Sequence, residues 1–443
     1  MEKVLLFNAP IYRYKCDIEE DYLPPLGLGY IATYLEKLNV NIKLIDCVAD
    51  KLGISEILST IEREEPNYII INVFTQNLPL VREIVEKCNS KVSFIIGGQV
   101  VKFISSDIIK WNTKNRIDVI IGEGEFIVSA IVSNKIKDEP VEFKENKRVF
   151  KVSSNSIYFP HDITNVRINR EYFKNREIIN HYGEIESAMV TSRGCIYDCA
   201  FCGGARSLNN DIKVRTISNE GISSEILDII DKAPNVRCIR ILDDLFLKNR
   251  NSIINAIKIF EKFEDLSWRG MAHILTFNNA YDLLKQLKQS GCKELFVGIE
   301  SGSSRIRELV NKDGSTEQLI DTVGKILQAG IDVKGYFIYG FPSETVDDFD
   351  LTFELARKLK CISSELDGNF RTSVFQFRPY HGTQLYNKII EKYGEIMDCT
   401  LNEEIGNYNG RSQYNFQSGN FTECTLEQIN EYITKTLELN SEV

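Results

Sequence analysis

Residues 193–202 read RGCIYDCAFC and place three thiols, Cys195, Cys199 and Cys202, within a run of eight residues. A structural zinc site takes four ligands, usually as two pairs a dozen or more residues apart, and this trio has no second pair. Three thiolates can instead hold three irons of a [4Fe-4S] cluster and leave the fourth iron open to a small molecule. The trio therefore predicts an iron-sulfur site with an open coordination position.

The composition is that of a globular protein. Of 443 residues, 43% are hydrophobic and 26% charged, so we expect two or three domains. No stretch approaches the roughly 18 apolar residues of a membrane span, and the first residues lack a signal pattern, so we expect a cytoplasmic protein without a membrane span. The net charge of −10 weighs against a nucleic-acid partner. The eight other cysteines stand singly, several in apolar segments, where buried and unreactive thiols are ordinary.

The sequence around the trio alternates between strand-like and helix-like segments. An expected strand over 184–195 runs directly into the first cysteine. Further strands are expected over 236–246, 266–274, 292–302, 331–342 and 371–383. About six strand-helix units predict a partial or complete βα barrel of the TIM type, whose chemistry lies at the C-terminal ends of the strands.

The first part of the chain has the same alternation. Strands are expected over 2–10, 41–48, 67–74, 92–98 and 117–125, with helices between them. This pattern predicts a doubly wound, Rossmann-like parallel sheet, which binds ligands at the carboxyl ends of its strands. The loops expected there contain the cofactor-binding candidates Thr75, Gln76, Gly97, Gly98, Gln99, Gly122, Glu123, Gly124 and Glu125. Glycines in such loops either let the backbone approach a ligand or simply end the strands.

We therefore expect an α/β chain in four parts. Residues 1–140 form the Rossmann-like domain, and 141–182 form a linker that contains a small hairpin. Residues 183–390 form the partial barrel, and 391–443 form a helical tail that packs on the barrel mouth or closes over a substrate.

The spacing Cys-x3-Cys-x2-Cys, with Phe201 before the last cysteine, resembles the radical S-adenosylmethionine (SAM) superfamily. The segments LDDLF, FVGIESG, YFIYGFPSET and FRPYHGTQLY resemble the core of the subgroup that carries an N-terminal cobalamin (B12)-binding domain. PPLGLGYIATYLEK, IIGG and IDVIIGEGE resemble that domain. The resemblance covers residues 1 to about 390 and follows motifs in a fixed order.

The resemblance implies roles for particular residues. The three cysteines bind a [4Fe-4S] cluster, whose open iron chelates the amine and carboxylate of SAM. Asp243 and Asp244, after the second strand, accept hydrogen bonds from an ammonium group, or they cap a helix or stay solvated. Glu300 binds ribose hydroxyls or the methionine moiety, and Gly335 and Gly340 let adenine approach the fifth strand. An external electron donor of the flavodoxin or ferredoxin type reduces the cluster.

The histidines bear on the cobalamin expectation. His161, His181, His273 and His381 all lie beyond residue 150, and no Asp-x-His-x-x-Gly motif is present. No histidine of the first domain can therefore ligate cobalt, whereas the subgroup it resembles commonly binds cobalamin without one. His273, near the end of the third barrel strand, faces the barrel interior or is a structural side chain.

The function that the resemblance favours is a cobalamin-dependent C-methyltransferase, which acts on an unactivated carbon of a small-molecule or peptide substrate through a 5′-deoxyadenosyl radical. The alternative is a radical enzyme of the same architecture that catalyses cyclisation, rearrangement or epimerisation. Epimerisation would require a thiol hydrogen donor, for which Cys238, Cys292 and Cys361 are candidates. A cofactor carrier without catalysis is the least favoured reading, because a carrier has no use for an open iron.

Overall fold

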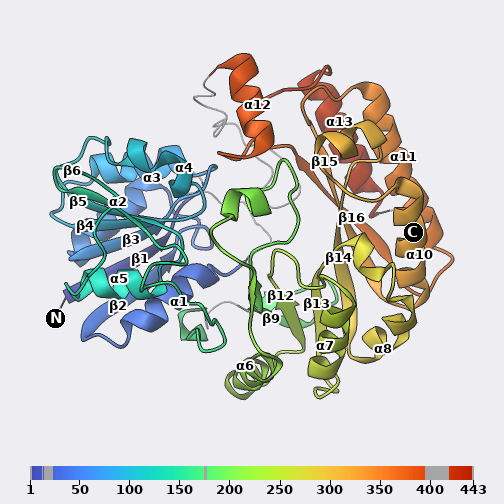
Figure 1. Ribbon diagram of the computed structural model, residues 1–443, viewed down its shortest axis with the longest axis horizontal. Helices are drawn as coiled ribbons and strands as arrows, with labels where there is room; N and C mark the ends of the chain where they lie inside the picture. Colours follow the sequence, from blue (N-terminus) through green and yellow to red (C-terminus); the bar gives the residue numbers. More distant parts are fainter. Residues whose placement is uncertain (1, 12, 14–22, 174–176, 395–418, 442–443) are drawn as a thin grey trace. The chain divides into compact units, whose positions relative to one another are not determined.

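The computed structural model describes residues 2–11, 13, 23–173, 177–394 and 419–441 (Figure 1). The described residues fall into two compact units, one formed by the residues up to 173 together with 380–382, and one formed by 177–379, 383–394 and 419–441. No helix in these ranges is both long and apolar enough to cross a membrane. The expected α/β class is correct for both units.

The first unit is built on a seven-stranded sheet with the order β2-β1-β3-β4-β5-β7-β6. Its strands are β1 (Glu2–Asn8), β2 (Val40–Asp46), β3 (Tyr68–Asn72), β4 (Ser93–Gly97), β5 (Arg116–Ile121), β6 (Glu142–Lys144) and β7 (Lys147–Lys151). All neighbouring strands are parallel except β6 and β7. The order of the first five strands is that of flavodoxin-like sheets, in which ligands bind at the switch point between β1 and β3.

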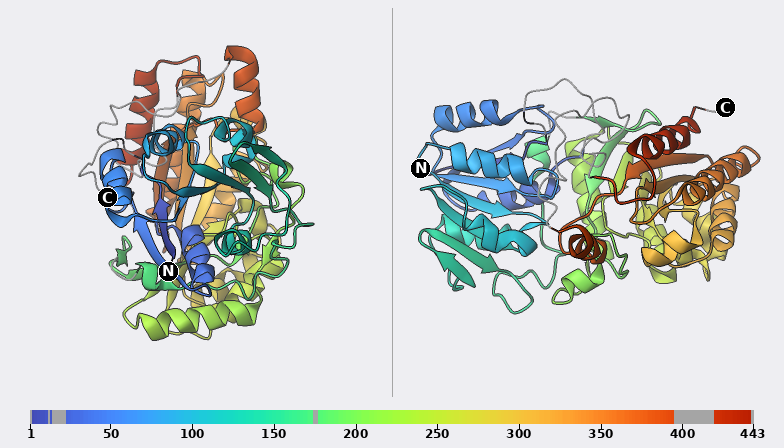
Figure 2. Two further views of the ribbon diagram at one scale, coloured as in Figure 1. Left: turned by 90° about the vertical axis from the view of Figure 1, so that its left-hand side faces the viewer. Right: turned by 90° about the horizontal axis from the view of Figure 1, so that it is seen from above.

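Helices cover both faces of this sheet, which is why its central strands are apolar throughout (Figure 2). The helices are α1 (Leu26–Leu35), α2 (Ile54–Glu64), α3 (Leu78–Lys87), α4 (Val101–Ile108) and α5 (Glu125–Val132). On one face α1 packs against α5, where Tyr34 and Phe126 meet edge to face at 4.9 Å between ring centroids. On the other face α2, α3 and α4 bury their apolar sides with Leu5 and Phe7 of β1.

The expected linker differs from the structure at its first residues. The hairpin expected within 141–182 is present as β6 and β7, but it extends the first sheet, because β7 pairs in parallel with β5 from Ile117 to Ile121. A short apolar segment around Val149 and Phe150 forms that strand between charged residues. Such a strand is too brief for a period-2 pattern to be recognised.

The second unit contains a curled half-barrel sheet with the order β16-β15-β14-β13-β12-β9-β8. Its strands are β8 (Ile178–Ile179), β9 (Ile185–Met189), β12 (Cys238–Ile241), β13 (Ser267–Ala272), β14 (Cys292–Glu300), β15 (Asp332–Tyr339) and β16 (Phe370–Gln376). The six strands from β9 to β16 are parallel, and only β8 pairs antiparallel. The expected partial barrel of six strands is therefore correct.

Most helices of the second unit lie along the outer side of this sheet, whereas α12 (Gln384–Tyr393) lies apart from that layer (Figure 1). The others are α6 (Asn219–Lys232), α7 (Arg250–Phe260), α8 (Leu284–Gln289), α9 (Ser304–Leu309), α10 (Thr316–Gln328), α11 (Val346–Ser363) and α13 (Leu426–Glu438). Side-chain oxygens of Ser218, Asn249 and Ser315 cap the first turns of α6, α7 and α10. Trp268 of β13 stacks on Phe260 of α7 at 4.9 Å, which fixes the outward face of that strand.

The C-terminal helix α13 packs against β16, β15 and α11. Its Thr436 hydroxyl lies 2.8 Å from the hydroxyl of Tyr339, and both side chains are fully buried. Asn440, just beyond the helix, hydrogen-bonds both backbone polar groups of Thr372 on the edge strand β16. In the described residues the expected tail is thus a structural helix that covers the outer face and edge of the half-barrel.

We expect Thr436→Val to destabilise the second unit by about 1–3 kcal/mol, because it leaves the buried hydroxyl of Tyr339 without its partner at nearly constant volume. Differential scanning calorimetry of the full chain should show the loss as a lower melting temperature. The double variant with Tyr339→Phe should melt closer to the wild type than Thr436→Val alone, since both polar groups are then removed. Equal melting temperatures for wild type and Thr436→Val would contradict this role.

Candidate active site

The three cysteines lie on a loop, residues 194–206, that follows the short strand β10 (Ser192–Arg193) at the C-terminal end of β9. We call this segment the cysteine loop. All three thiols are free and partly exposed. Burial by the surrounding protein raises the pKa of each thiol, that of Cys202 to about 12. The free thiols are therefore protonated, and a bound metal would deprotonate them.

Asp243, just beyond the end of β12, anchors the start of the cysteine loop. One of its carboxylate oxygens accepts the backbone N–H groups of Thr191 and Ser192 at 2.6 and 3.0 Å, and the other accepts their hydroxyls at 2.6 and 2.7 Å. Burial raises the pKa of Asp243, although these four hydrogen bonds favour the carboxylate. Its side chain is thus fully used in positioning the loop.

Lys248 joins the same anchor from the segment after β12. Its ammonium donates to the hydroxyl of Ser192 at 2.7 Å, and that hydroxyl in turn donates to Asp243. Burial lowers the pKa of Lys248, while the charges of Asp243, Cys195 and Asp244 oppose that shift. Neither Thr191, Ser192 nor Lys248 was expected from the sequence. In the sequence, only the position of these three residues near the ends of the first two barrel strands could have pointed to them.

Two further contacts hold the middle of the cysteine loop. The ring of Tyr197 stacks on His273, which follows β13, with 4.2 Å between centroids and 24° between planes. The backbone N–H of Ala200 donates to the carbonyl of Val310, and its carbonyl accepts the N–H of Leu385 at the start of α12. The loop is therefore fixed on several sides by elements distant in sequence.

His273 is a neutral imidazole. Its Nδ1 accepts the backbone N–H of Leu275 at 3.2 Å, which leaves the proton on Nε2. Burial, together with the charges of Lys312 and Arg307, lowers the pKa of His273 to about 3. His273 was expected either to face the barrel interior or to be a structural side chain. Its contacts favour the structural role, in which the ring packs on the cysteine loop.

The donor set fits a cubane cluster. In the described residues, no three His, Cys, Asp or Glu side chains converge where a single ion would bind. A [4Fe-4S] cluster makes a different demand, because each thiolate bonds its own iron. Three partly exposed thiols on one anchored loop meet that demand. Phe201, beside Cys202, packs on Phe341 at 5.5 Å and supplies an apolar side to the site.

Asp244 differs from its neighbour Asp243, because solvent reaches its side chain. Burial by nearby protein and the charge of Asp243 raise the pKa of its carboxyl group. A Cβ atom placed on Gly204 of the cysteine loop would lie 3.5 Å from Oδ1 of Asp244, so the carboxylate stands directly beside the loop. Of the expected pair, Asp244 is the exposed carboxylate and Asp243 the buried one.

Glu300, the last residue of β14, forms a buried ion pair. Its Oε1 lies 2.9 Å from Nζ of Lys312, and both side chains are almost entirely excluded from solvent. The backbone of Glu300 is left-handed, with φ of 65°, at a register shift between β14 and β15. A Cβ on Gly298 would lie 2.3 Å from that oxygen and 2.7 Å from Nζ, so a side chain there would displace the ion pair.

The two glycines of β15 have different surroundings. A Cβ on Gly335 would lie 2.7 Å from Ile299 and 2.8 Å from Phe370, so this glycine makes room for apolar side chains of β14 and β16. Gly340 has φ of 102° and donates its N–H to Oε2 of Glu344 at 2.7 Å. Packing explains Gly335, and only Gly340 lies in the turn at the end of the strand.

Glu344 is a buried carboxyl group that was not expected from the sequence. Oε2 accepts the N–H groups of Gly340 and Phe341, and Oε1 has no hydrogen-bond partner among the described residues. Burial raises its pKa to about 8, against the effect of these two donors. At neutral pH it therefore stays largely protonated and holds the turn at Phe341, whose ring packs on Phe201.

The candidates of the first unit lie where the strands β3, β4 and β5 end. Thr75 and Gln76 follow β3 and are buried, and Oε1 of Gln76 has no hydrogen-bond partner among the described residues. An unpartnered acceptor of this kind suits a ligand donor or a water molecule. Gly97 and Gln99 flank the end of β4, and an added Cβ on Gly97 would meet nothing closer than 3.9 Å. At this edge Gly97 thus leaves room for a side-chain carbon, and Thr75 is already in contact with His381, 3.2 Å from Oγ1 to Nδ1.

At other loop glycines of this edge, neighbouring parts of the chain leave no room for a side chain. Gly98 and Gly122 have φ of 128° and 100°, and a Cβ on either would come within 2.4 Å of a backbone oxygen, of Val73 or Val152. Gly124 lies against Ile31. Glu123 precedes this glycine, and Glu125 is the buried first residue of α5. For Gly98 and Gly122 the strand-ending explanation suffices.

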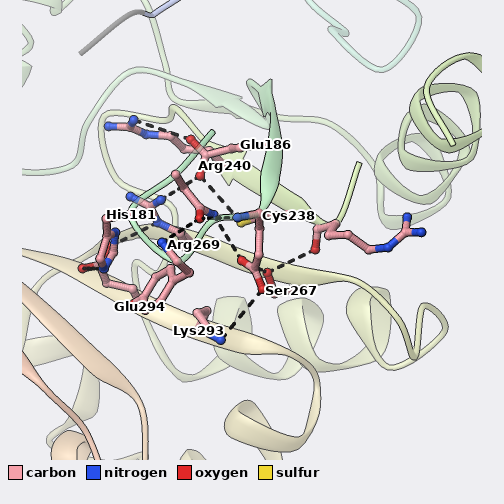
Figure 3. A network of polar contacts seen from close by, with 12 residues as sticks. His181, Glu186, Cys238, Arg240, Ser267, Arg269, Lys293 and Glu294 are labelled. Carbon is pink, nitrogen blue, oxygen red and sulfur yellow. Dashed lines mark hydrogen bonds and ion pairs between the residues drawn. The ribbon is translucent and has the colours of Figure 1, made fainter. Parts of the chain in front are cut away.

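Charged side chains at the start of the barrel strands form a buried network (Figure 3). Arg269 bridges Glu186 and Glu294 at 2.8 and 3.1 Å, and Arg371 donates to Glu294 at 2.8 Å. Cys238 donates its thiol to Glu186 at 3.6 Å. Because these residues come from β9, β12, β13, β14 and β16, the network fixes the register of five strands at the end opposite to the cysteine loop.

Comparison with known families agrees with this geometry. Residues 189–356 match the family model of the radical SAM superfamily, and residues 20–132 match that of the B12 binding domain. The first range contains the cysteine loop and most of the half-barrel, and the second contains β2, β3, β4 and β5 of the first sheet. The chain therefore contains a B12-binding domain match followed by a radical SAM domain match, in the order in which the two units follow one another in the sequence.

Individual relatives extend the match beyond these models. A protein of Pyrococcus horikoshii described as an uncharacterized methyltransferase is 28% identical over 83% of this chain and 78% of its own. The cytidylyl-2-hydroxyethylphosphonate methyltransferase of Streptomyces wedmorensis is 20% identical over 88% of this chain and 82% of its own. Both relatives span the two units.

Solved structures share the fold. The cobalamin-dependent radical enzyme OxsB, with aqua-cobalamin and SAM bound, aligns with a TM-score of 0.63 at 17% identity over 98% of this chain. The radical SAM methyltransferase TsrM of Kitasatospora setae aligns with a TM-score of 0.63 at 15% identity, over 88% of this chain and 76% of its own. This chain spans 52 to 66% of the OxsB chains.

We expect Asp243→Ala to lower the iron content after anaerobic reconstitution to less than about half that of the wild type, since each stranded buried donor costs about 1–3 kcal/mol. Iron and sulfide analysis of the desalted protein measures the effect. Asp244→Asn, which removes a neighbouring charge and keeps a side-chain oxygen for the backbone N–H of Gly194, should keep the wild-type iron content. A fully loaded Asp243→Ala variant would show that the loop does not need this anchor.

The raised pKa of Glu344 predicts a pH dependence. Because the folded protein binds this proton more tightly than the unfolded chain, its contribution to stability is present at low pH and is lost as pH rises through about 8. Each unit of pKa difference corresponds to about 1.4 kcal/mol. The melting temperature of the wild type should fall more steeply than that of Glu344→Gln between about pH 5 and about pH 9. Parallel curves would contradict the burial of a protonated carboxyl group.

Proposed function

We propose that this protein is a cobalamin-dependent radical SAM methyltransferase that adds a methyl group to an unactivated carbon of a small-molecule or peptide substrate. The observation that carries the proposal is the presence, in one chain, of an anchored three-cysteine loop on a half-barrel and a flavodoxin-like sheet that matches the B12 binding domain. Two relatives that span both units and are described as methyltransferases support the choice of reaction.

The residues of the second unit have distinct tasks in this proposal. When bound, the cluster and SAM supply a carbon radical that removes a hydrogen atom, and cobalamin supplies a methyl carrier. Cys195, Cys199 and Cys202 would hold the cluster, and Asp243 positions their loop. Asp244 would accept hydrogen bonds from an ammonium group beside that loop.

The first unit would hold cobalamin at the ends of β3 and β4. Gln76 offers an unpartnered acceptor there, and Gly97 leaves the space of a side chain open. No histidine lies in the loops of this sheet, but His381 reaches its edge from residues 380–382 of the same unit, with Nδ1 3.2 Å from the hydroxyl of Thr75.

The alternative of epimerisation has less support. Cys238 and Cys292 are the first residues of β12 and β14, so they lie at the end of the half-barrel opposite to the cysteine loop. Cys361 is exposed on the outer helix α11. A hydrogen donor for a substrate radical must lie near the site at the other end of the strands.

The proposed reaction also needs an electron from outside the chain. A one-electron donor of the flavodoxin or ferredoxin type would reduce the cluster, and a chemical reductant can replace it in the test.

The proposal is tested by anaerobic reconstitution with iron, sulfide and hydroxocobalamin, followed by desalting and metal analysis. We expect about four irons and about one cobalt per chain. With dithionite and SAM carrying a deuterated methyl group, the loaded protein should form both 5′-deoxyadenosine and S-adenosylhomocysteine, and candidate substrates are then screened for the labelled methyl group.

Cys199→Ser is the matched control. It should lose iron and 5′-deoxyadenosine formation and keep its cobalt, because the cobalamin site is proposed in the other unit. Four irons without cobalt in the wild type would remove the methyltransferase proposal and favour a radical reaction without methyl transfer.

A further inference from the structure

We propose that the ammonium of Lys312, held beside the cysteine loop by its buried ion pair with Glu300, raises the reduction potential of the [4Fe-4S] cluster, and that the carboxylate of Glu300 offsets part of this effect. The inference rests on the part of the proposed function in which the three cysteines hold that cluster, and it does not depend on cobalamin or on methyl transfer. It assigns a role to Lys312, which no motif in the sequence indicated.

The pair is built at the cost of local strain. Glu300 has a left-handed backbone, which is rare for a residue other than glycine, asparagine or aspartate. The same point of β14 shifts register against β15, and Gly298 lacks the side chain that would collide with both charged groups. Strained residues of this kind persist where the surrounding structure determines them, often at functional sites.

Lys312 sits on a segment tied to both β14 and the cysteine loop. Its backbone N–H donates to the carbonyl of Arg307, whose guanidinium in turn donates to the carbonyl of Ile299 at 2.7 Å. Two residues earlier, Val310 accepts the N–H of Ala200, and the side chain of Asn311 donates to the carbonyl of Asp198 at 3.3 Å. The ammonium is thus held in a fixed position relative to the thiols.

Lys312 lies beside the proposed cluster site, because Val310 and Asn311, which precede it directly, both hydrogen-bond the backbone of the cysteine loop. Burial alone would lower the pKa of Lys312, but the charge of Glu300 opposes burial and the pKa is raised, so the ammonium keeps its charge. With Lys312 almost excluded from solvent, this charge is screened much less than a surface lysine.

This arrangement predicts the sign of an effect on the potential. Reduction adds one electron to the cluster, and the donor is oxidised by one electron. A fixed positive charge stabilises the more negative, reduced cluster, and Glu300 offsets part of that stabilisation. Loss of Lys312 should therefore make the potential more negative, and loss of the charge on Glu300 should make it more positive.

The test is a potentiometric titration of the reconstituted cluster without SAM or cobalamin, followed by the electron paramagnetic resonance signal of the reduced form. For Lys312→Met we expect the ratio of reduced to oxidised cluster at a fixed potential to fall about tenfold, which is a shift of about 59 mV for one electron. Lys312→Arg, which keeps the charge, should stay near the wild type. Lys325→Met, which removes an exposed lysine of α10, should leave the potential unchanged.

Glu300→Gln should shift the midpoint potential in the opposite direction to Lys312→Met. It also provides a second measurement in case Lys312→Met fails to fold. It keeps an oxygen for the Lys312 ammonium and should shift the midpoint to a more positive value. The proposal is overturned if an iron-loaded Lys312→Met has the wild-type midpoint, or if Lys312→Arg shifts as far as Lys312→Met. If Lys312→Met holds no iron, the proposal is overturned when the midpoint potential of Glu300→Gln equals that of the wild type or is more negative. It is also overturned if neither variant holds a cluster. A protein that binds no cobalamin would refute the proposed methyltransferase and leave this measurement intact.

Discussion

The geometry of the site depends on one buried carboxylate. Asp243 gathers two backbone amides and two hydroxyls from Thr191 and Ser192, so the chain leaves the first barrel strand in a single direction before it reaches Cys195. Within the cysteine loop there are only a few turn-type backbone hydrogen bonds, such as the one from the N–H of Cys202 to the carbonyl of Cys199 at 3.1 Å. The rest of its order comes from side chains and from neighbouring elements. Asp243, just beyond the second barrel strand, contributes both of its carboxylate oxygens as acceptors.

The sequence predicts the parts of this protein that follow from local pattern. Apolar strands alternate with amphipathic helices, so the half-barrel and the parallel sheet could be expected. Glu300 and Gly340 could likewise be placed at strand ends. The cysteine spacing pointed to the cluster because its chemistry is confined to eight residues.

What the sequence could not predict depends on contacts between distant residues. The partners of Asp243 lie about fifty residues before it, and nothing in their spacing shows that its carboxylate is consumed by the anchor. Lys312 is a single lysine among polar residues until the register shift after Gly298 brings Glu300 to it. The glycines show the same limit, because Gly97 and Gly98 are adjacent, yet one faces open space and the other is required by the backbone of Val73.

The contact between Tyr339 and Thr436 also bears on where this chain can be divided for expression. The radical SAM match ends at residue 356, inside α11 and before the last strand β16. A fragment cut there would lack the edge strand and helix α13, and the rings of Tyr339 and Phe349, which pack on Tyr432, would face solvent. Such a fragment would expose an unpaired strand edge and an apolar face, a combination that favours aggregation. The second unit therefore has a folding boundary that lies well beyond its family boundary, and it includes the C-terminal helix.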